Sequence, residues 1–409
     1  MNIVLEPGAA VLLDELHRAG FGAYAVGGCV RDSLLGLAPH DWDLCTAARP
    51  GQVMELFGED RCIPTGLQHG TVTVKRDGKL YEITTFRTEG RYSDGRHPDS
   101  VAFVPDLRED LARRDFTINA MAYSAEEGLC DPFGGREDLA RGVVRAVGEP
   151  LRRFGEDALR ILRLYRFAAR FGFAIDEATE AAAKQLASHL DCVSAERIEE
   201  ELNKLLAAPQ PGAYLEPEVL AFVLPELPPE ELTKARRRID ALPAGTEQVS
   251  ARWAALLLPL GETGARKALK RLKCSNARID GAAALVRECG EKTPDALDKC
   301  DLRLQAKRLL GKYDLHTVQQ LTALWTALAP EEKASFDALR AEAEALTAQG
   351  VCCRISQLAV NGRDLMAAGA APGPGLRRVL EALLEEVITG RLPNEKTELL
   401  AFAAGFSAS

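Results

Sequence analysis

The chain has 409 residues, of which 46% are hydrophobic and 27% are charged. These values are ordinary for a globular protein, so they exclude wholesale disorder and a fibrous repeat, and the length predicts about two to four domains. Sixty acidic residues against 51 Lys and Arg give a net charge of −9. This charge excludes a protein coated uniformly with basic groups but allows a local basic stripe. Any phosphate binding is therefore expected at a local site rather than over the whole surface.

Neither a membrane nor a metal-bound cysteine cluster is indicated. No stretch approaches about 18 apolar residues, and the first residues lack the charged and apolar regions of a signal peptide. We therefore expect a cytoplasmic protein. The ten cysteines contain no C-x-x-C pair, which favours reduced, mostly buried thiols over a zinc or redox site.

In chain order, a predicted helix at 9–19 precedes several short β-type runs, many of them bounded by Gly, Pro or Asp. These runs are 23–26, 42–45, 71–74, 81–86 and 101–104. They predict an α/β head with a mixed sheet over residues 1–145. From Leu151 onward the composition is typical of helices, so an all-α neck (146–208), body (209–345) and tail (346–409) are predicted, with breaks near 207–230 and 369–375.

The first group of candidate site residues follows the first predicted strand. Gly27 and Gly28 lead into a predicted helix, and such a turn places backbone N–H groups where an anion such as a triphosphate is favoured. Arg31 adds a positive charge. Asp41 and Asp43 lie two residues apart in a β-type run, so both carboxylates are expected on one face of the sheet.

Two carboxylates held this close repel each other unless a cation lies between them. Mg²⁺ takes one or two carboxylates together with substrate phosphates, so Asp41 and Asp43 are predicted metal ligands. A phosphate-binding turn and a metal pair within 17 residues, 27–43, predict one nucleotide site. Glu82 is a candidate third carboxylate, although an ordinary outward strand residue is an equally good interpretation.

Two arginine-containing segments complete the candidate site. In the first, Arg113 and Arg114 are adjacent, so at most one of them is expected to face a given ligand. In the second, a single helix over 152–170 is predicted, with an apolar side and a charged side. Arg163 and Arg166 have no acidic residue three or four positions away, which predicts an external anion as their partner.

Asp157 and Arg160 are expected as neighbours on that helix, where they would offer an acceptor beside donors. Cytosine and adenine both present an exocyclic amine beside a ring-nitrogen acceptor, while uracil and guanine reverse this order. The pair would therefore accept C and A and refuse U and G.

Together these segments resemble the class II tRNA nucleotidyltransferases, the bacterial-type CCA-adding enzymes of the polymerase-beta-like nucleotidyltransferase superfamily. The similarity runs from about residue 23 to 206 and resumes at 355–365 and 375–398. It implies that Asp41 and Asp43 hold metal, and that nucleotide is bound by Gly28, Arg31, Arg114, Asp157, Arg160, Arg163 and Arg166. It also implies CTP and ATP as substrates, tRNA as partner, and a neck motif at 194–205. No protein partner is indicated.

The resemblance leaves alternatives open. A poly(A) polymerase, or an enzyme that adds only C-C or only A, would share the head and neck. The polar segment 87–99 resembles in length and polarity a loop that helps the family switch from C to A, which favours full C-C-A synthesis. A non-catalytic RNA-binding protein is a further alternative, against which the intact Asp41 and Asp43 argue.

No His-Asp phosphohydrolase domain is seen, so added phosphatase activity is not expected. Basic groups at 234–238 and 266–273 are candidate contacts for RNA phosphates.

Overall fold

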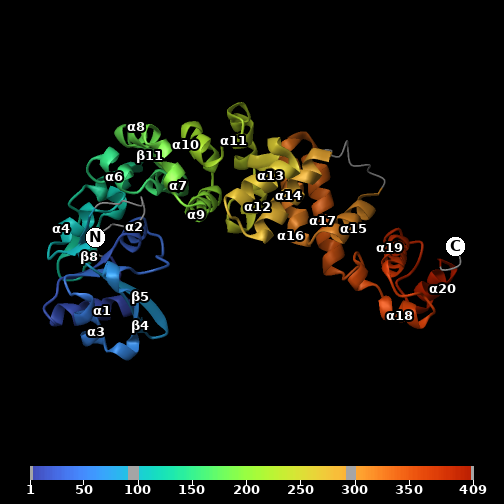
Figure 1. The fold of residues 1–409 in the computed structure, drawn as a ribbon, viewed down its shortest axis with the longest axis horizontal. Coiled ribbons are helices and arrows are strands. Elements are labelled where there is room, and N and C mark those ends of the chain that lie inside the picture. The colour runs from blue at the N-terminus through green and yellow to red at the C-terminus, as the bar shows by residue number, and fades with distance from the viewer. Residues whose placement is uncertain (1–2, 91–100, 292–300, 407–409) are drawn as a thin grey trace. The chain divides into compact units, whose positions relative to one another are not determined.

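A computed structural model describes residues 3–90, 101–291 and 301–406, and it divides the chain into two compact units, Met1–Pro229 and Glu230–Ser409. Figure 1 shows strands only near the N-terminal end of the chain and helices in the rest. An α/β head followed by all-α parts is thereby confirmed. The predicted division into four domains stays a prediction. Within the described ranges, no helix is both long enough and apolar enough to cross a bilayer.

The head is built on a seven-stranded sheet of order β3-β4-β5-β2-β1-β8-β9. Only the β2–β5 pair is parallel, so the sheet is mixed. Its strands are β1 (Ala23–Val26), β2 (Leu44–Thr46), β3 (Cys62–Gly66), β4 (Thr71–Arg76), β5 (Lys79–Thr85), β8 (Ala122–Ser124) and β9 (Gly128–Cys130). Two separate two-stranded sheets pair β6 (Arg87–Glu89) with β7 (Val101–Phe103) and β10 (Val143–Val144) with β11 (Ala174–Ile175).

Burial is consistent with the central place of β1 in the sheet. All four residues of β1 are buried, as is typical of a strand covered on both faces. α1 packs on β1 and buries Leu12, Leu13 and Leu16, while α3 packs on β4 and β5. The head helices are α1 (Pro7–Arg18), α2 (Gly28–Leu34), α3 (Pro50–Phe57), α4 (Leu107–Ala112) and α5 (Gly135–Arg141).

Five helices follow the head within the first unit: α6 (Pro150–Glu156), α7 (Leu159–Phe171), α8 (Glu177–Gln185), α9 (Ala195–Leu206) and α10 (Pro217–Val223). The predicted single helix over 152–170 is wrong, because the chain is extended at Asp157 (φ −144°, ψ 104°) between α6 and α7. The apolar side predicted for this segment is buried as expected. α7 ends at Gly172, whose left-handed conformation (φ +66°) is one that glycine adopts without a Cβ penalty.

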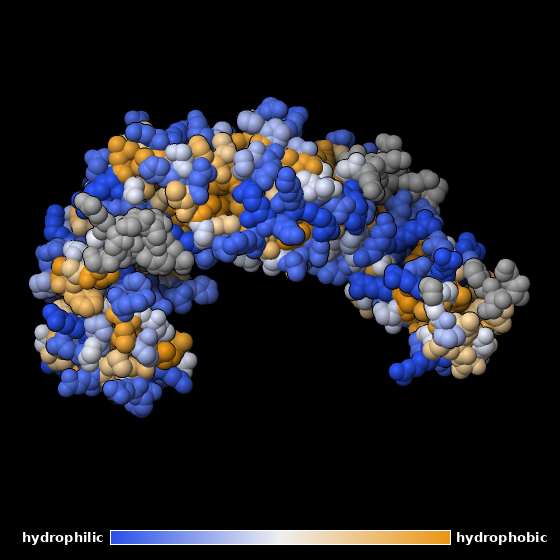
Figure 2. Space-filling view, viewed as in Figure 1, coloured by the Kyte–Doolittle hydropathy of each residue, from blue (hydrophilic) through white to orange (hydrophobic). Residues whose placement is uncertain are grey.

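The second unit is helical throughout its described part. Its helices are α11 (Leu232–Asp240), α12 (Val249–Leu257), α13 (Gly261–Arg271), α14 (Asn276–Glu291), α15 (Leu302–Lys312), α16 (Leu315–Leu328), α17 (Lys333–Ala348), α18 (Gly362–Ala367), α19 (Pro374–Ile388) and α20 (Lys396–Phe406). α12 is almost wholly buried, and α18–α20 share a small core that includes Leu365, Leu383 and Leu399. The break predicted at 369–375 falls between α18 and α19. Hydrophilic residues dominate the visible face in Figure 2, with scattered apolar patches.

Candidate nucleotide and metal site

The predicted carboxylates gather at one edge of the head sheet. Asp41 and Asp43 are exposed on either side of the buried Trp42, so the predicted alternation is confirmed although β2 itself begins at Leu44. Leu44 of β2 is paired with Ile83 of β5 in the parallel register. Asp43, directly before β2, therefore stands beside Glu82 of β5, and Glu82 is exposed as well.

Asp43 experiences the charges of the whole group. Its side chain is open to solvent, yet protein atoms crowd its carboxylate and remove part of its hydration. This desolvation raises the pKa of Asp43, and repulsion from Glu82 and Asp41 raises it further, while Arg114 opposes the shift. The cluster is thus acidic, partly compensated by one arginine.

The donor set fits a hard divalent cation. No group of three or more His, Cys, Asp or Glu side chains is arranged to hold a metal within the part of the chain that the structure describes. Two carboxylates are, however, the number that Mg²⁺ typically takes when substrate phosphates and waters supply its other ligands. Asp41 and Asp43 therefore fit such an ion, and Glu82 adds negative charge beside them.

Gly27 and Gly28 form the turn from β1 into α2. Gly27 has a φ of +79°, and a Cβ at this position would lie 3.0 Å from the Arg114 guanidinium, so the turn needs glycine and brings Arg114 close to it. Arg31 is only 3% exposed and donates to Asp32 (2.8 Å) and to Asn119. The structure thus places Gly28 and Arg114 at the site, with Arg31 buried behind the turn.

Arg113 and Arg114 both turn toward one buried carboxylate, while the prediction that at most one of them faces a ligand stays a prediction. Arg113 donates to Asp110 Oδ1 (3.0 and 2.9 Å), and Arg114 Nη2 lies 3.4 Å from Asp110 Oδ2. Asp110 is fully buried in α4, and both arginines follow the end of that helix, where the chain bends. One desolvated carboxylate therefore gathers both guanidinium groups.

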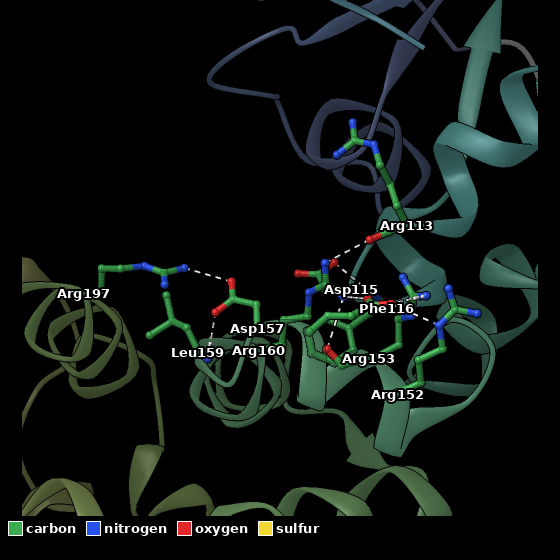
Figure 3. A network of polar contacts seen from close by, with 10 residues as sticks. Arg113, Asp115, Phe116, Arg152, Arg153, Asp157, Leu159, Arg160 and Arg197 are labelled. Atoms are coloured by element: carbon green, nitrogen blue, oxygen red, sulfur yellow. Dashed lines mark hydrogen bonds and ion pairs between the residues drawn. The ribbon is translucent and has the colours of Figure 1, made fainter. Parts of the chain in front are cut away.

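Asp157 and Arg160 do not bond to each other. Asp157 accepts from the Leu159 backbone N–H (3.1 Å) and from Arg197 of α9 (2.8 Å), so it caps the start of α7. Arg160 donates to the backbone carbonyls of Arg113 (3.0 Å) and Arg153 (3.3 Å) and to the Glu156 carboxylate (3.1 Å). Figure 3 shows the Arg197 side chain extending toward Asp157, whereas Arg113 takes part through its carbonyl oxygen and its side chain points away. The break at Asp157 replaces the expected helical neighbours with two separately anchored side chains.

The prediction that Arg163 and Arg166 need an external anion is wrong. Arg163 donates to Asp115 Oδ2 (2.9 and 2.5 Å), and Arg166 Nε lies 2.5 Å from Glu201 Oε2 in an ion pair that lacks hydrogen-bond alignment. Asp115 is 8% exposed and Glu201 4% exposed. The acids that neutralise the two arginines come from the head and from α9, 48 and 35 positions away along the chain.

Asp115, Arg197 and Glu201 matter here but are not among the predicted site residues, although Arg197 and Glu201 lie in the neck motif at 194–205. Asp115 also accepts from Asn119 (3.0 Å), and with Arg163 this keeps the pKa of Asp115 well below its ordinary value although burial opposes the shift. Arg197 and Glu201 are four residues apart on α9, hence on one helix face. That spacing indicates that both side chains contact the same neighbouring segment, which in the structure is the start of α7 and Arg166.

Comparisons with known proteins agree along the chain. Three protein-family models match the chain. The family described as poly A polymerase head domain matches residues 23–145, and the family described as probable RNA and SrmB-binding site of polymerase A matches 172–228. The family described as tRNA nucleotidyltransferase domain 2 (putative) matches 245–403. The CCA-adding enzyme of Limosilactobacillus fermentum is 38% identical over 411 residues, covering 97% of this chain and 96% of that protein. The chain belongs to the CCA-adding enzymes.

Solved structures agree with this membership. The crystal structure of the Bacillus stearothermophilus CCA-adding enzyme in complex with CTP superposes with a TM-score of 0.80 at 33% identity, covering 99% of this chain and 98% of the other. The Thermotoga maritima CCA-adding enzyme complexed with tRNA shares the fold, with a TM-score of 0.69 at 22% identity over 98% and 96% of the two chains. CCA-adding enzymes are nucleotidyltransferases, so the family inferred from the motifs is confirmed and the non-catalytic alternative is disfavoured.

Proposed function

We propose that the CCA-adding activity of this chain is complete C, C and A addition to the tRNA 3′ end from CTP and ATP without a nucleic-acid template. The exposed pair Asp41 and Asp43, with Glu82 beside it at the Gly27–Gly28 turn, supports nucleotidyl transfer. The observation that favours complete C, C and A addition is the 38% identity to a CCA-adding enzyme over 97% of the chain. A nucleotide triphosphate brings negative charge, which this acidic edge tolerates only with a cation between the two. In the proposed reaction the 3′-OH attacks the α-phosphate in line and pyrophosphate leaves.

Asp41 and Asp43 would hold the divalent cation, proposed to be Mg²⁺. Such an ion supplies charge neutralisation for the attacking and leaving oxygens. The negative charge of Glu82 would add to the attraction that holds the cation. The Gly28 turn and Arg114 would bind the triphosphate, because Arg114 already lies against the turn and lowers the negative potential at Asp43.

Nucleotide choice is assigned to Asp157 and Arg160. Asp157 is an acceptor with two anchored oxygens, and Arg160 is 8% exposed and fixed by two carbonyls and by the Glu156 carboxylate (3.1 Å). Reading C or A would require these anchors to be exchanged for base edges, so a substrate-induced adjustment at the α6–α7 break belongs to the proposal. Arg31, Arg163 and Arg166 are already neutralised by carboxylates, and we propose that their charges support the site from behind it.

The remaining assignments are proposals of the same kind. Residues 1–145 would be the catalytic head, 146–208 the neck, and 209–345 with 346–409 the parts that bind the tRNA, in a cytoplasmic protein. The basic groups of α11 and α13 support tRNA binding only in part, since Lys234 is paired with Glu231 (2.8 Å) and Arg266 with Asp280 (2.7 Å). The proposed C-to-A loop, 87–99, lies outside the described residues from position 91 onward.

The test is a turnover assay with tRNA that lacks its terminal triplet. Supplied with CTP and ATP, the enzyme should add C, C and A and then stop, and a chelator should block addition. Asp41→Asn should remove detectable incorporation while the melting temperature of the protein stays unchanged, because the side chain is exposed. A long A tail would support a poly(A) polymerase, and addition that stops after C-C would support the partial enzyme. Near-normal C addition by Asp41→Asn would refute the metal assignment.

Asp157→Ala tests base selection separately. It should permit UTP or GTP incorporation at a measurable fraction of the CTP rate, since the acceptor for the exocyclic amine is lost. Glu137→Ala is the control, because Glu137 is a carboxylate 77% exposed whose partner, Arg141, lies with it on the head helix α5. Selectivity unchanged in Asp157→Ala would contradict the assignment.

A further inference from the structure

Two neighbouring residues at the end of α7 contact two neighbouring residues of α2. Arg170 Nη2 donates to Asp32 Oδ2 (3.1 Å), and the Arg31 guanidinium lies 5.0 Å from the centre of the Phe171 ring. Contacts also join the residues within each helix, because Arg31 donates to Asp32 Oδ1 (2.8 Å) and the Arg170 guanidinium lies over the Phe171 ring (4.9 Å). We call these four residues the α2–α7 clasp.

The clasp is buried on the side of α2 and open on the side of α7. Arg31 is 3% exposed and Asp32 7%, whereas the Arg170 side chain is 45% exposed. Each oxygen of Asp32 accepts from a different arginine. Charge-assisted hydrogen bonds and a guanidinium over a ring face are stronger where water is partly excluded. The clasp therefore holds the end of α7 at a fixed place on α2, although 138 positions separate Asp32 from Arg170.

Another contact ties the middle of α7 to the head. Arg163 donates to Asp115, which follows α4. A rigid helix held at one point can pivot, whereas two contacts separated along its axis fix its direction. Arg163 and Arg170 are separated by about 10 Å along the helix axis. The clasp is therefore the contact that sets the direction of α7 relative to α2.

These two helices begin at the two ends of the proposed nucleotide site. α2 begins at the Gly27–Gly28 turn, where the triphosphate is proposed to bind. α7 begins beside Asp157 and includes Arg160, the two residues proposed to read the base. A nucleotide has to reach both ends at once, so its binding depends on the distance and direction between them.

We propose that Asp32, Arg170 and Phe171 are positioning residues for nucleotide binding. By holding α7 against α2, they keep the start of α7 at the distance from the turn that one nucleotide spans. Their role is indirect, because Asp32 is buried and the two residues of α7 lie at the opposite end of that helix from Asp157. The proposal rests on the proposed function, and it implies that a ligand spanning both ends needs the clasp while a ligand bound at the turn alone does not.

Inorganic pyrophosphate is the ligand that makes this distinction. It is the product that leaves, and it occupies only the triphosphate end of the proposed site, so its inhibition of C addition should not depend on α7. The assay uses the full-length enzyme, tRNA that lacks its terminal triplet and a constant Mg²⁺ concentration. Arg170→Met should raise the KM for CTP about fivefold, as for the loss of one partly exposed ion pair, and should leave the pyrophosphate inhibition constant within about twofold of wild type. Phe171→Leu, which removes the ring face but keeps an apolar side chain, should do the same.

Conservative variants and a matched control accompany these two. Arg170→Lys keeps a positive charge beside Asp32, and Phe171→Tyr keeps the ring face, so each should restore the KM of the wild type. Arg141→Met is the matched control, because Arg141 is likewise the basic residue in the last turn of a helix, α5, and is 67% exposed in a single pair with Glu137 (3.9 Å). It should leave both constants unchanged.

Two results would overturn the proposal. If the KM for CTP and the pyrophosphate constant rise by the same factor, the substitutions damage the whole site and the clasp has no positioning role. If the KM for CTP is unchanged in both Arg170→Met and Phe171→Leu, the clasp does not affect nucleotide binding. Failure of the proposed function would be seen elsewhere, in the product pattern of the wild type and in the selectivity of Asp157→Ala.

Discussion

Replacing Asp115 with alanine should destabilise the first unit more than any surface substitution. The change removes two contacts to Arg163 (2.9 and 2.5 Å), one to Asn119 (3.0 Å) and one to the Phe116 N–H (2.8 Å). Removing one partner of a buried ion pair typically costs about 3–5 kcal/mol. Because the Arg163 side chain is 34% exposed and water can partly solvate it, we expect the lower end, about 3 kcal/mol.

The assay is thermal unfolding followed by circular dichroism, with the melting temperature compared between variants. For a unit of this size, about 3 kcal/mol corresponds to a decrease of roughly 6–12 °C. Glu137→Ala, which breaks an exposed pair with Arg141 at 3.9 Å, is the control and should change the melting temperature by less than about 2 °C. If Asp115→Ala melts with the control, the ion pair does not stabilise the unit and the reasoning fails.

The same carboxylate predicts a pH dependence. Its folded-state pKa lies below the ordinary 3.8, because Arg163 and Asn119 favour the ionised form more than burial opposes it. The stabilisation is therefore present above pH 3.8 and is lost as the pH falls through the folded-state pKa. The difference in stability between wild type and Asp115→Asn should shrink steadily below that pH, and a difference that stays constant would contradict the assignment.

Two further substitutions test other parts of the first unit. The pKa of Glu216 is raised from 4.5 to about 6, so the stabilisation by its protonated form is present below pH 4.5 and is lost as the pH rises through 6. Glu216→Gln should therefore be more stable than wild type by about 1 kcal/mol at pH 8, a figure that allows for the lost contact to Lys184, and should show no such gain at pH 4.5. Urea unfolding at the two pH values measures this, and an equal effect at both would contradict it. Gly135→Ala should cost about 1–3 kcal/mol, because its Cβ would lie 2.1 Å from the Thr117 carbonyl oxygen, whereas Gly155→Ala in open space on α6 should be neutral or stabilising. Equal melting temperatures for these two variants would refute the close approach.

Local pattern predicted much of the head. β1 is where its buried apolar run indicated, and the predicted runs at 71–74 and 81–86 correspond to β4 and β5. The run at 101–104 forms β7, outside the main sheet. β3 was missed because it contains Pro64, which is tolerated only since β3 is an edge strand. β8 was missed because its three residues show no alternation, and pairing with β1 defines it.

The sequence by itself determined the family, from several short motifs in a fixed order. It also determined the alternation that exposes Asp41 and Asp43 and the glycines of the turn into α2, because these depend on residues within a few positions of one another. Only the tertiary structure decided the partners of the arginines. Asp115 reaches Arg163 from the head and Glu201 reaches Arg166 from α9, distances along the chain that no local spacing records. Charges are neutralised by whatever group folding brings close, so an arginine without a nearby acid in sequence can still be fully paired in the folded protein.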